Sequence, residues 1–162
     1  MKKINVTIIC PWEEEYPGCE DLLKTYPEIN LVASFNGLDE AGHRRALEGS
    51  DVLLLDEAVI ELEGTEKVRA IHAAYPGIKT LQIVGKRSEN NTMAAISLGV
   101  RGVLERASLV PMLRKAITVL YSGETWISRD VVQSLHIQSR YLDDRSVWLA
   151  ATVALPGGNK LN

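Results

Sequence analysis

Short apolar runs alternate along this chain with longer segments in which apolar residues recur at helical spacing. Each run is rich in Val, Ile and Leu, is short enough for a β-strand, and is bounded by turn residues. The runs lack the in/out alternation of a half-exposed strand, which favours a parallel sheet covered by helices on both faces. The predicted strands are residues 4–10, 29–35, 51–55, 78–84 and 102–104.

The segments between these strands have the periodicity of amphipathic helices. Pro27 and Gly77 lie where two of the helices are expected to end, and Ser108 is a candidate N-terminal cap for another. A strand followed by a helix, repeated five times, predicts a doubly wound α/β fold with right-handed crossovers. Helices are predicted at residues 19–26, 38–47, 65–75, 92–98 and 111–121, and two more follow at 128–136 and 143–155.

In a doubly wound sheet, the functional crevice lies beyond the carboxyl ends of the strands. The third strand ends in a carboxylate, whose side chain we expect to project into this crevice. The residues placed there are Cys10 and Pro11 after the first strand, Asp56 after the third, Val84 and Gly85 after the fourth, and Arg106 after the fifth.

The composition of the chain argues against three classes of protein: nucleic-acid-binding, membrane-spanning and secreted proteins. The 162 residues carry 18 basic and 21 acidic side chains, a formal net charge of −3, so the chain as a whole does not attract nucleic acid. No run approaches the roughly 18 apolar residues that a membrane span needs, and the amino terminus reads directly into a strand without a signal-peptide pattern. These features predict a cytoplasmic protein with no membrane partner.

Two cysteines, Cys10 and Cys19, stand nine positions apart and outside any metal-binding spacing. They predict neither a disulfide framework nor a zinc site, and we interpret both as buried or half-buried thiols. No glycine-rich phosphate loop follows the first strand.

Three separated motifs carry a family resemblance: the strand ending in Asp56, the sequence GVRGVLER at 99–106, and KAI at 115–117 continuing to SGETWIS at 122–128. They resemble the receiver domain of bacterial two-component response regulators of the NarL/FixJ (LuxR-type) family over about residues 4–128. The resemblance implies a flavodoxin-like fold with strand order 2-1-3-4-5, followed by C-terminal helices. It further implies that Asp56 matches the residue that accepts a phosphoryl group from a sensor histidine kinase, beside a magnesium ion held largely by an acidic pair.

The other positions of the family's phosphorylation pocket are altered in this chain. Magnesium requires oxygen ligands, so Asp56 would hold the ion almost alone, and we expect no required cofactor. A hydrogen bond to a charged group contributes roughly 1.5–3 kcal/mol, which a valine cannot supply to a phosphoryl oxygen. Cys10 and Pro11 replace the acidic pair, Val84 the hydroxyl residue, Val103 the aromatic residue and Arg106 the lysine.

Some residues near the pocket could compensate for these changes. Arg106 keeps the positive charge, and we expect its guanidinium to pair directly with Asp56 in place of a metal ion. The glutamates at 13–15 could return a carboxylate to the pocket, although such a run is more often a solvated loop. Trp12 stands beside the pocket and could plug it.

The carboxyl-terminal part of the chain weakly resembles the start of a LuxR-type helix-turn-helix. Arg145 and Asn159 are 14 residues apart, as in that family, but the chain ends at Asn162 before a complete recognition helix. We therefore expect DNA contact only through a complete effector domain, which this chain lacks. The predicted organisation is a receiver domain at 1–123, a linker with a helix at 124–141, and an incomplete helix-turn-helix segment at 142–162.

These observations favour an atypical receiver domain of a LuxR-type transcriptional regulator, acting as a protein-interaction and dimerisation module without enzymatic turnover. Its expected partners are a second copy and a sensor histidine kinase. Pairing is expected through the fourth helix, fifth strand and fifth helix, or through the first and fifth helices. Two alternatives stay open: a competent receiver phosphorylated on Asp56, and a flavodoxin-like protein that binds a small ligand or acts as an enzyme.

Overall fold

The computed structural model of the chain describes residues 2–11, 19–39 and 42–139. The predicted helix at 143–155 and the helix-turn-helix segment at 142–162 lie outside the described residues, so both stay predictions.

A five-stranded parallel sheet forms the centre of the fold, with strand order β2-β1-β3-β4-β5. This order and the α/β class confirm the sequence prediction. All four pairings are parallel, so the carboxyl ends of the strands lie at one edge of the sheet. The strands are β1 (Ile4–Ile9), β2 (Ile29–Phe35), β3 (Val52–Asp56), β4 (Lys79–Val84) and β5 (Gly102–Glu105).

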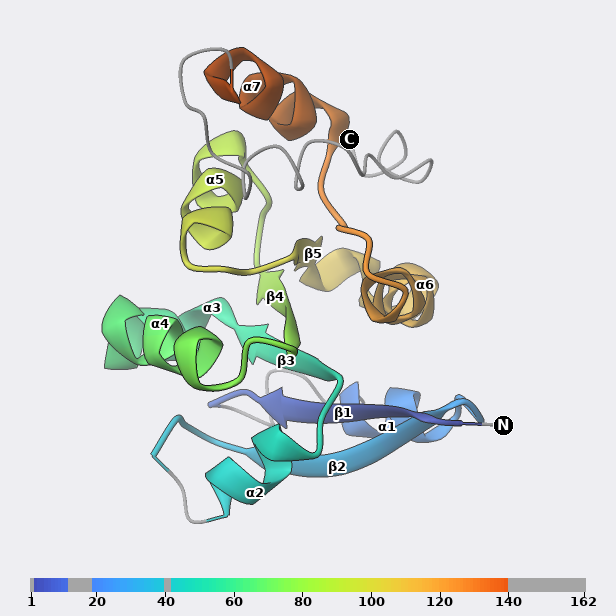
Figure 1. The fold of residues 1–162 in the computed structure, drawn as a ribbon. Coiled ribbons are helices and arrows are strands. Elements are labelled where there is room, and N and C mark those ends of the chain that lie inside the picture. The colour runs from blue at the N-terminus through green and yellow to red at the C-terminus, as the bar shows by residue number, and fades with distance from the viewer. Residues whose placement is uncertain (1, 12–18, 40–41, 140–162) are drawn as a thin grey trace.

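Helices cover both faces of the sheet (Figure 1). The described helices are α1 (Cys19–Lys24), α2 (His43–Glu48), α3 (Glu57–Glu63), α4 (Thr65–Ala74), α5 (Glu89–Ser97), α6 (Leu109–Tyr121) and α7 (Arg129–Ser139). Helices α1 and α6 lie on one face, and α2 to α5 lie on the other.

The strands β1, β3 and β4 are almost wholly buried, in keeping with their largely apolar sequences, whereas the edge strand β2 alternates between exposed and half-buried positions after Ile29. In β3, Leu54 packs in the cluster under α1 and α6, whereas Leu53 and Leu55 pack in the cluster under α2 to α4. All three side chains are at most 1% exposed. Full burial of a leucine side chain stabilises the fold by roughly 1.5–3 kcal/mol, so these three side chains contribute substantially to its stability.

Helix α3 was not predicted. Its seven residues follow β3 without a loop, and Gly64, with a φ of 92°, separates α3 from α4. Among the residues of α3, Val59 alone is buried, so the segment lacks the apolar stripe that marks a longer amphipathic helix. The helix is started instead by Asp56, whose side chain accepts a hydrogen bond from the Ala58 amide as an N-cap.

Two helix starts differ from the prediction. Helix α2 begins at His43 rather than at residue 38, because Gly42 before it has a φ of 86° and the Leu38 amide instead donates to Glu63 Oε2 at 3.0 Å. The predicted Ser108 cap is wrong as well. A 3₁₀ turn (Arg106–Ser108) precedes α6, and Ser108, with a φ of −100° and a ψ of 2°, makes no side-chain cap hydrogen bond.

The segment after α6 closes the free edge of the sheet. Trp126 pairs with Gly102 of β5: its amide donates to the Arg101 carbonyl, and its carbonyl accepts from the Val103 amide, each at 3.0 Å. The indole is fully buried in the cluster under α6. Only glycine fits at position 102, since a Cβ there would lie 2.9 Å from the Trp126 Cβ.

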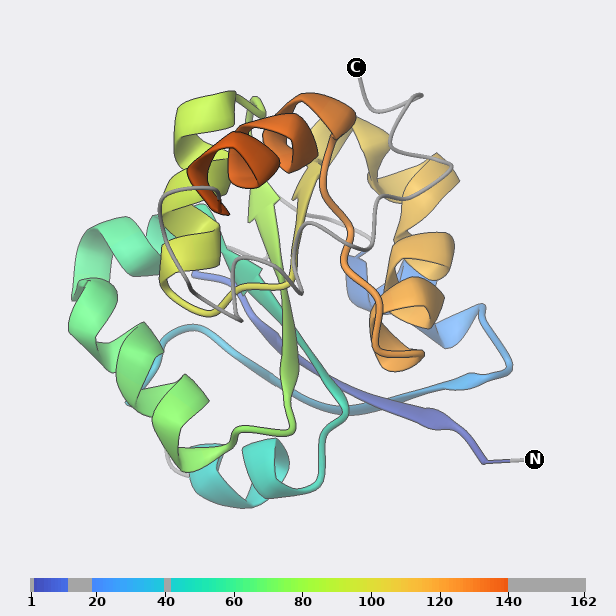
Figure 2. The same cartoon turned by 45° about the horizontal axis from the view of Figure 1, so that its top comes forward.

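Helix α7 packs on α5, as the views in Figures 1 and 2 both show. Ile127, Val131 and Val132 form a buried cluster with Met93 and Ile96 of α5. The helix predicted at residues 128–136 is therefore present as α7, and it covers part of the surface of α5.

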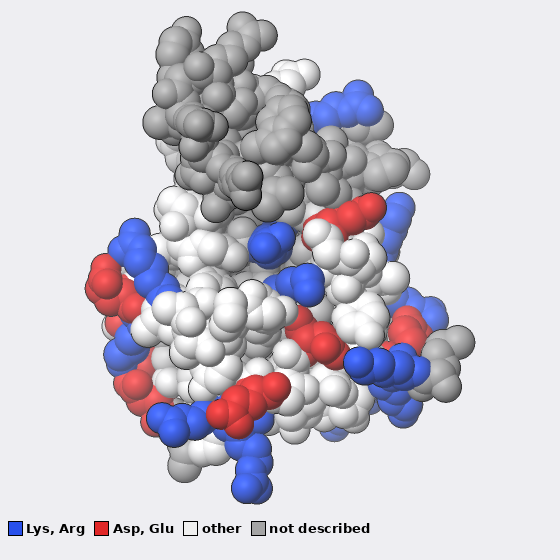
Figure 3. All heavy atoms as spheres, in the orientation of Figure 1, with Lys and Arg blue, Asp and Glu red and all other residues white. Residues whose placement is uncertain are grey.

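In the described residues we find no membrane-spanning helix and, on the face in Figure 3, no separation of acidic from basic side chains. None of the described helices has the length and apolar character needed to cross a membrane. On the face that Figure 3 shows, acidic and basic side chains of the described residues are interspersed, in keeping with the small net charge.

His72 of α4 fastens the loop between α5 and β5 to the sheet. Its Nδ1 donates to the Leu98 carbonyl, and its Nε2 lies 2.7 Å from Thr80 Oγ1 of β4. Burial lowers the pKa of His72 below its ordinary value. The neutral imidazole is therefore the form that the folded protein favours.

We predict that this histidine makes the fold sensitive to mild acid. The pKa of His72 is lower in the folded than in the unfolded state. Its contribution to the free energy of unfolding is therefore fully present above the unfolded-state pKa and decreases as the pH falls below that value. Urea unfolding from about pH 7.5 to about pH 5.5 should show a loss of at most about 1.4 kcal/mol per pH unit from this residue. His72→Gln should flatten this part of the profile, and an unchanged slope in the variant would contradict the assignment.

Candidate functional site

The predicted crevice residues lie at the carboxyl-end edge of the sheet, but only some of their side chains meet. Cys10 directly follows β1, Asp56 is the last residue of β3, and Arg106 directly follows β5. Arg106 Nη2 lies 3.6 Å from Asp56 Oδ2, so the structure brings the predicted pair together.

Asp56 is a buried carboxylate with two different oxygen environments. The residue is only 2% exposed. Oδ1 accepts a hydrogen bond of 2.8 Å from the Ala58 amide at the start of α3. Oδ2 has no hydrogen-bond partner among the described residues and lies within ion-pair distance of Arg106, whose side chain is 36% exposed. Removing a carboxylate from water costs free energy unless a positive charge lies nearby. For Oδ2, the Arg106 guanidinium is the main positive charge in this part of the structure.

A small cavity adjoins Asp56, with a volume of about 20 Å³, room for about one water molecule. Its walls are aliphatic apart from Asp56 and two thiols. Burial, together with nearby Cys10, Glu20 and Asp56, raises the pKa of the Cys19 thiol to about 12, so this thiol stays protonated at neutral pH. The cavity is lined by Ile8, Ile9, Cys10, Cys19, Leu54, Asp56 and Ile83.

Of the predicted pocket residues, Cys10 and Asp56 line this cavity, and the other four do not. Val84 and Val103 are buried together with Ala95 and Val100 in a separate cluster beneath α5. Ile83, one residue before Val84, supplies the wall of the cavity from β4. Pro11 is half-buried beyond Cys10 and is not among the residues lining the cavity.

Sequence reasoning missed Glu57 as a residue of this crevice. Its Oε1 accepts a hydrogen bond of 3.1 Å from the amide of Gly85, the first residue after β4. Gly85 also approaches the guanidinium, since a Cβ at this position would lie 3.6 Å from Arg106 Nη1. The available signal was the position of Glu57, a carboxylate at the first residue after the β3 strand, where its side chain can reach the neighbouring strand end.

The described residues do not fit a magnesium ion. Such an ion takes several oxygen ligands, whereas the cavity beside Asp56 offers one carboxylate among thiols and aliphatic side chains. Within residues 2–11, 19–39 and 42–139, no group of three or more His, Cys, Asp or Glu side chains could hold a metal ion. The glutamates at 13–15 and Trp12, considered from the sequence as substitutes, lie outside the described residues.

Comparison with known proteins gives relatives of one kind, although no protein-family model matches the chain. The transcriptional regulatory protein DegU of Brevibacillus brevis is 25% identical over 140 residues, which are 86% of this chain and 59% of DegU. The response regulator UvrY of Escherichia coli is 22% identical over 132 residues, 82% of this chain and 61% of UvrY. The chain is thus similar in sequence to bacterial response regulators.

The solved structures agree on the receiver fold. The structure of a LuxR-family two-component response regulator from Aurantimonas matches with a TM-score of 0.70 and 18% identity, over 86% of this chain and 99% of that one. The apo receiver domain of RcsB from Salmonella enterica serovar Typhimurium matches with a TM-score of 0.69 and 19% identity, over 83% and 99% of the two chains. The chain spans about three fifths of the length of DegU and UvrY.

We predict that Asp56 stabilises the receiver fold through both of its oxygens. Asp56→Asn keeps an acceptor for the Ala58 amide, whereas Asp56→Ala removes the cap of α3 and should cost about 1 kcal/mol more than the asparagine variant. Arg106→Ala should destabilise by about 1–2 kcal/mol, because it leaves Oδ2 buried without a counter-charge.

Chemical denaturation of the three variants measures these differences. In the Asp56→Asn background, Arg106→Ala should lose most of its effect, since no carboxylate then needs compensation. Additive effects of Asp56→Asn and Arg106→Ala would contradict the pairing.

Proposed function

We propose that this receiver domain works as a protein-interaction module whose acceptor crevice is neutralised internally and is not phosphorylated. The observation that carries the proposal is the ion pair between Arg106 and Asp56, in which the carboxylate is 2% exposed and its Oδ2 faces the guanidinium. In this arrangement Arg106 supplies the positive charge that a metal ion supplies in a phosphorylated crevice. Signalling then depends on protein contacts rather than on a covalent modification.

The crevice supports this interpretation over the phosphoacceptor alternative. Phosphoryl transfer needs positive charge around the transferred group and an in-line approach to the acceptor oxygen. Asp56 offers little accessible surface for such an approach, and its surroundings are aliphatic side chains and protonated thiol. The alternative of a small-ligand-binding protein gains no support from this cavity, because its volume is about that of one water molecule.

We predict that the chain forms no stoichiometric phosphoryl adduct on Asp56. Incubation with acetyl phosphate and magnesium, followed by intact mass spectrometry, should leave the mass unchanged, because the described crevice lacks the ligands for the metal. The matched variant combines Cys10→Asp with Pro11→Asp, which places two carboxylates after β1. It should gain magnesium-dependent mass on Asp56 and lose that gain when Asp56→Asn is added. A magnesium-dependent, Asp56-dependent adduct in the parent chain that alters its oligomeric state would overturn the proposal.

The interaction module is proposed to form a homodimer through α1 and α6. The other surface considered from the sequence includes α5, which the chain's own α7 partly covers. On α6, Val110 is 77% exposed and lies one helical turn before Arg114, which pairs with Glu28 near α1. A second copy related by a twofold axis would bury this apolar side chain.

The dimer has a direct test in two matched surface variants. Val110→Glu should shift the protein from dimer to monomer in light scattering, because like charges would then meet across the twofold axis. Leu62→Glu, at a side chain that is 64% exposed on α3, is the control and should leave the mass unchanged. If Val110→Glu and Leu62→Glu have the same mass in light scattering, the face formed by α1 and α6 is not the interface.

A further inference from the structure

We propose that Cys10 and Cys19 form a redox-reactive thiol pair, which a peroxide oxidises to an intramolecular disulfide that closes the cavity beside Asp56. Cys10 directly follows β1, and Cys19 is the first residue of α1. Both residues line the same cavity, whose volume is about 20 Å³. The proposal concerns these two sulfur atoms and does not depend on whether Asp56 is ever phosphorylated.

The fold brings the two thiols to one place from different elements. The Cys10 amide donates to the Phe35 carbonyl of β2 at 2.9 Å, which holds this residue in line with β1. Cys19 packs from α1 against the same buried cluster as Cys10. The cavity that they share has room for about one water molecule, so bond formation requires movement across roughly that width.

The surroundings of the thiols favour a product without charge. Apart from Asp56, the other walls of the cavity are four aliphatic side chains. Two thiolates that bind a monovalent soft cation keep a net negative charge, which would lie beside the Asp56 carboxylate in an apolar cavity. A structural zinc ion takes four ligands, whereas the described residues around the cavity offer two thiols and one carboxylate. A disulfide is neutral and therefore fits this cavity better than either metal ion.

The two thiols have different roles in this reaction. Burial is the main reason that the pKa of Cys19 is raised to about 12, and the neighbouring Cys10 adds to the effect. The thiolate is the form of cysteine that attacks a peroxide, and burial disfavours it at Cys19. Cys10 is therefore the thiol that reacts with the peroxide, and Cys19 is the thiol that completes the bond.

The oxidation has two steps. In the first, the Cys10 sulfur attacks one oxygen of hydrogen peroxide, the O–O bond breaks, and the departing hydroxide takes up the thiol proton and leaves as water. Cys10 is then a sulfenic acid. In the second, the Cys19 sulfur displaces the sulfenic hydroxyl, which takes the Cys19 proton and leaves as water while the S–S bond forms. The two electrons that the thiols lose reduce the peroxide.

The disulfide would attach the start of α1 covalently to the end of β1. Helix α1 has six residues, of which Leu23 is buried, so one added bond at its first residue is a large addition to its contacts. Residues 11–18 lie between the two cysteines, and the bond closes this short loop in the unfolded chain as well. The oxidised protein should therefore have a Tm that is roughly 5–10 °C higher than that of the reduced protein.

Counting the reactive thiols of the full chain tests the proposal. After treatment with hydrogen peroxide and unfolding in urea, N-ethylmaleimide should label neither cysteine, whereas it should label both in the untreated chain and again after reduction with dithiothreitol. Cys10→Ala and Cys19→Ala each leave one thiol and should show no rise in Tm with peroxide. Dimedone, which traps sulfenic acids, should label Cys10 in Cys19→Ala and should leave Cys19 unlabelled in Cys10→Ala.

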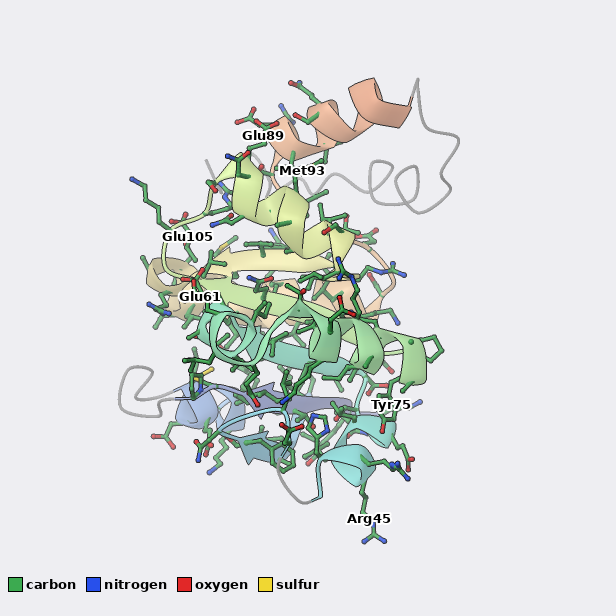
Figure 4. The ribbon with its side chains drawn as sticks, turned by 90° about the vertical axis from the view of Figure 1, so that its left-hand side faces the viewer. Arg45, Glu61, Tyr75, Glu89, Met93 and Glu105 are labelled. Carbon is green, nitrogen blue, oxygen red and sulfur yellow. The ribbon has the colours of Figure 1, made fainter. Side chains whose placement is uncertain are left out.

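Methionine oxidation is the side reaction that this experiment must distinguish. Met93, which lies on α5 beneath α7 in Figure 4, is one residue that peroxide can convert to a sulfoxide. A sulfoxide adds an oxygen atom but leaves the maleimide labelling unchanged. The labelling of the parent chain tests the bond even if a variant does not fold. Two labels after peroxide, a disulfide between two chains, or a sulfinic acid on Cys10 without a bond to Cys19 would overturn the proposal.

Discussion

The buried carboxylate of Asp56 imposes the main constraint on this structure, because a charge removed from water must be compensated by nearby groups. Two elements provide the compensation from opposite directions: the first turn of α3 donates an amide to Oδ1, and Arg106 after β5 brings its guanidinium to Oδ2. The ends of β3 and β5 are thereby tied to one residue. The same carboxylate also starts α3, which positions Glu57 to hold the end of β4.

Around this residue, the structure has the receiver fold, and the described crevice combines one carboxylate with a guanidinium, thiols and aliphatic side chains. The fold agrees with that of a solved LuxR-family response regulator, which matches the chain with a TM-score of 0.70. The cavity beside Asp56, however, is lined by thiols and aliphatic groups, which stabilise neither a divalent cation nor a phosphoryl group. A guanidinium can act as the counter-charge of a carboxylate, and Arg106 Nη2 lies 3.6 Å from Asp56 Oδ2.

The carboxyl-terminal part of the described chain gives the receiver a second layer of interactions. Trp126 extends the sheet beyond β5 and is held by backbone hydrogen bonds on both sides of Gly102. This fixed point directs the chain back over α5, where Ile127 and Val131 become buried. An exposed sheet edge and an apolar helix face are thus both covered by the segment that follows α6, which reduces the surface open to unwanted pairing.

The sequence by itself determined the order of strands and helices, because continuous apolar runs and helical spacing are local properties of a doubly buried sheet and its covering helices. It also placed Asp56 and Arg106, which carry opposite charges, after the third and fifth strands at the same edge of the sheet. Only the tertiary structure decided which side chains meet there. Cys19 joins the cavity, Val84 turns away from it and Glu57 reaches Gly85, since such contacts depend on side-chain direction and on residues about 28 positions apart. The short helix α3 escaped prediction for a different reason: Val59 is its one buried residue, so it lacks the apolar stripe from which a longer helix is predicted.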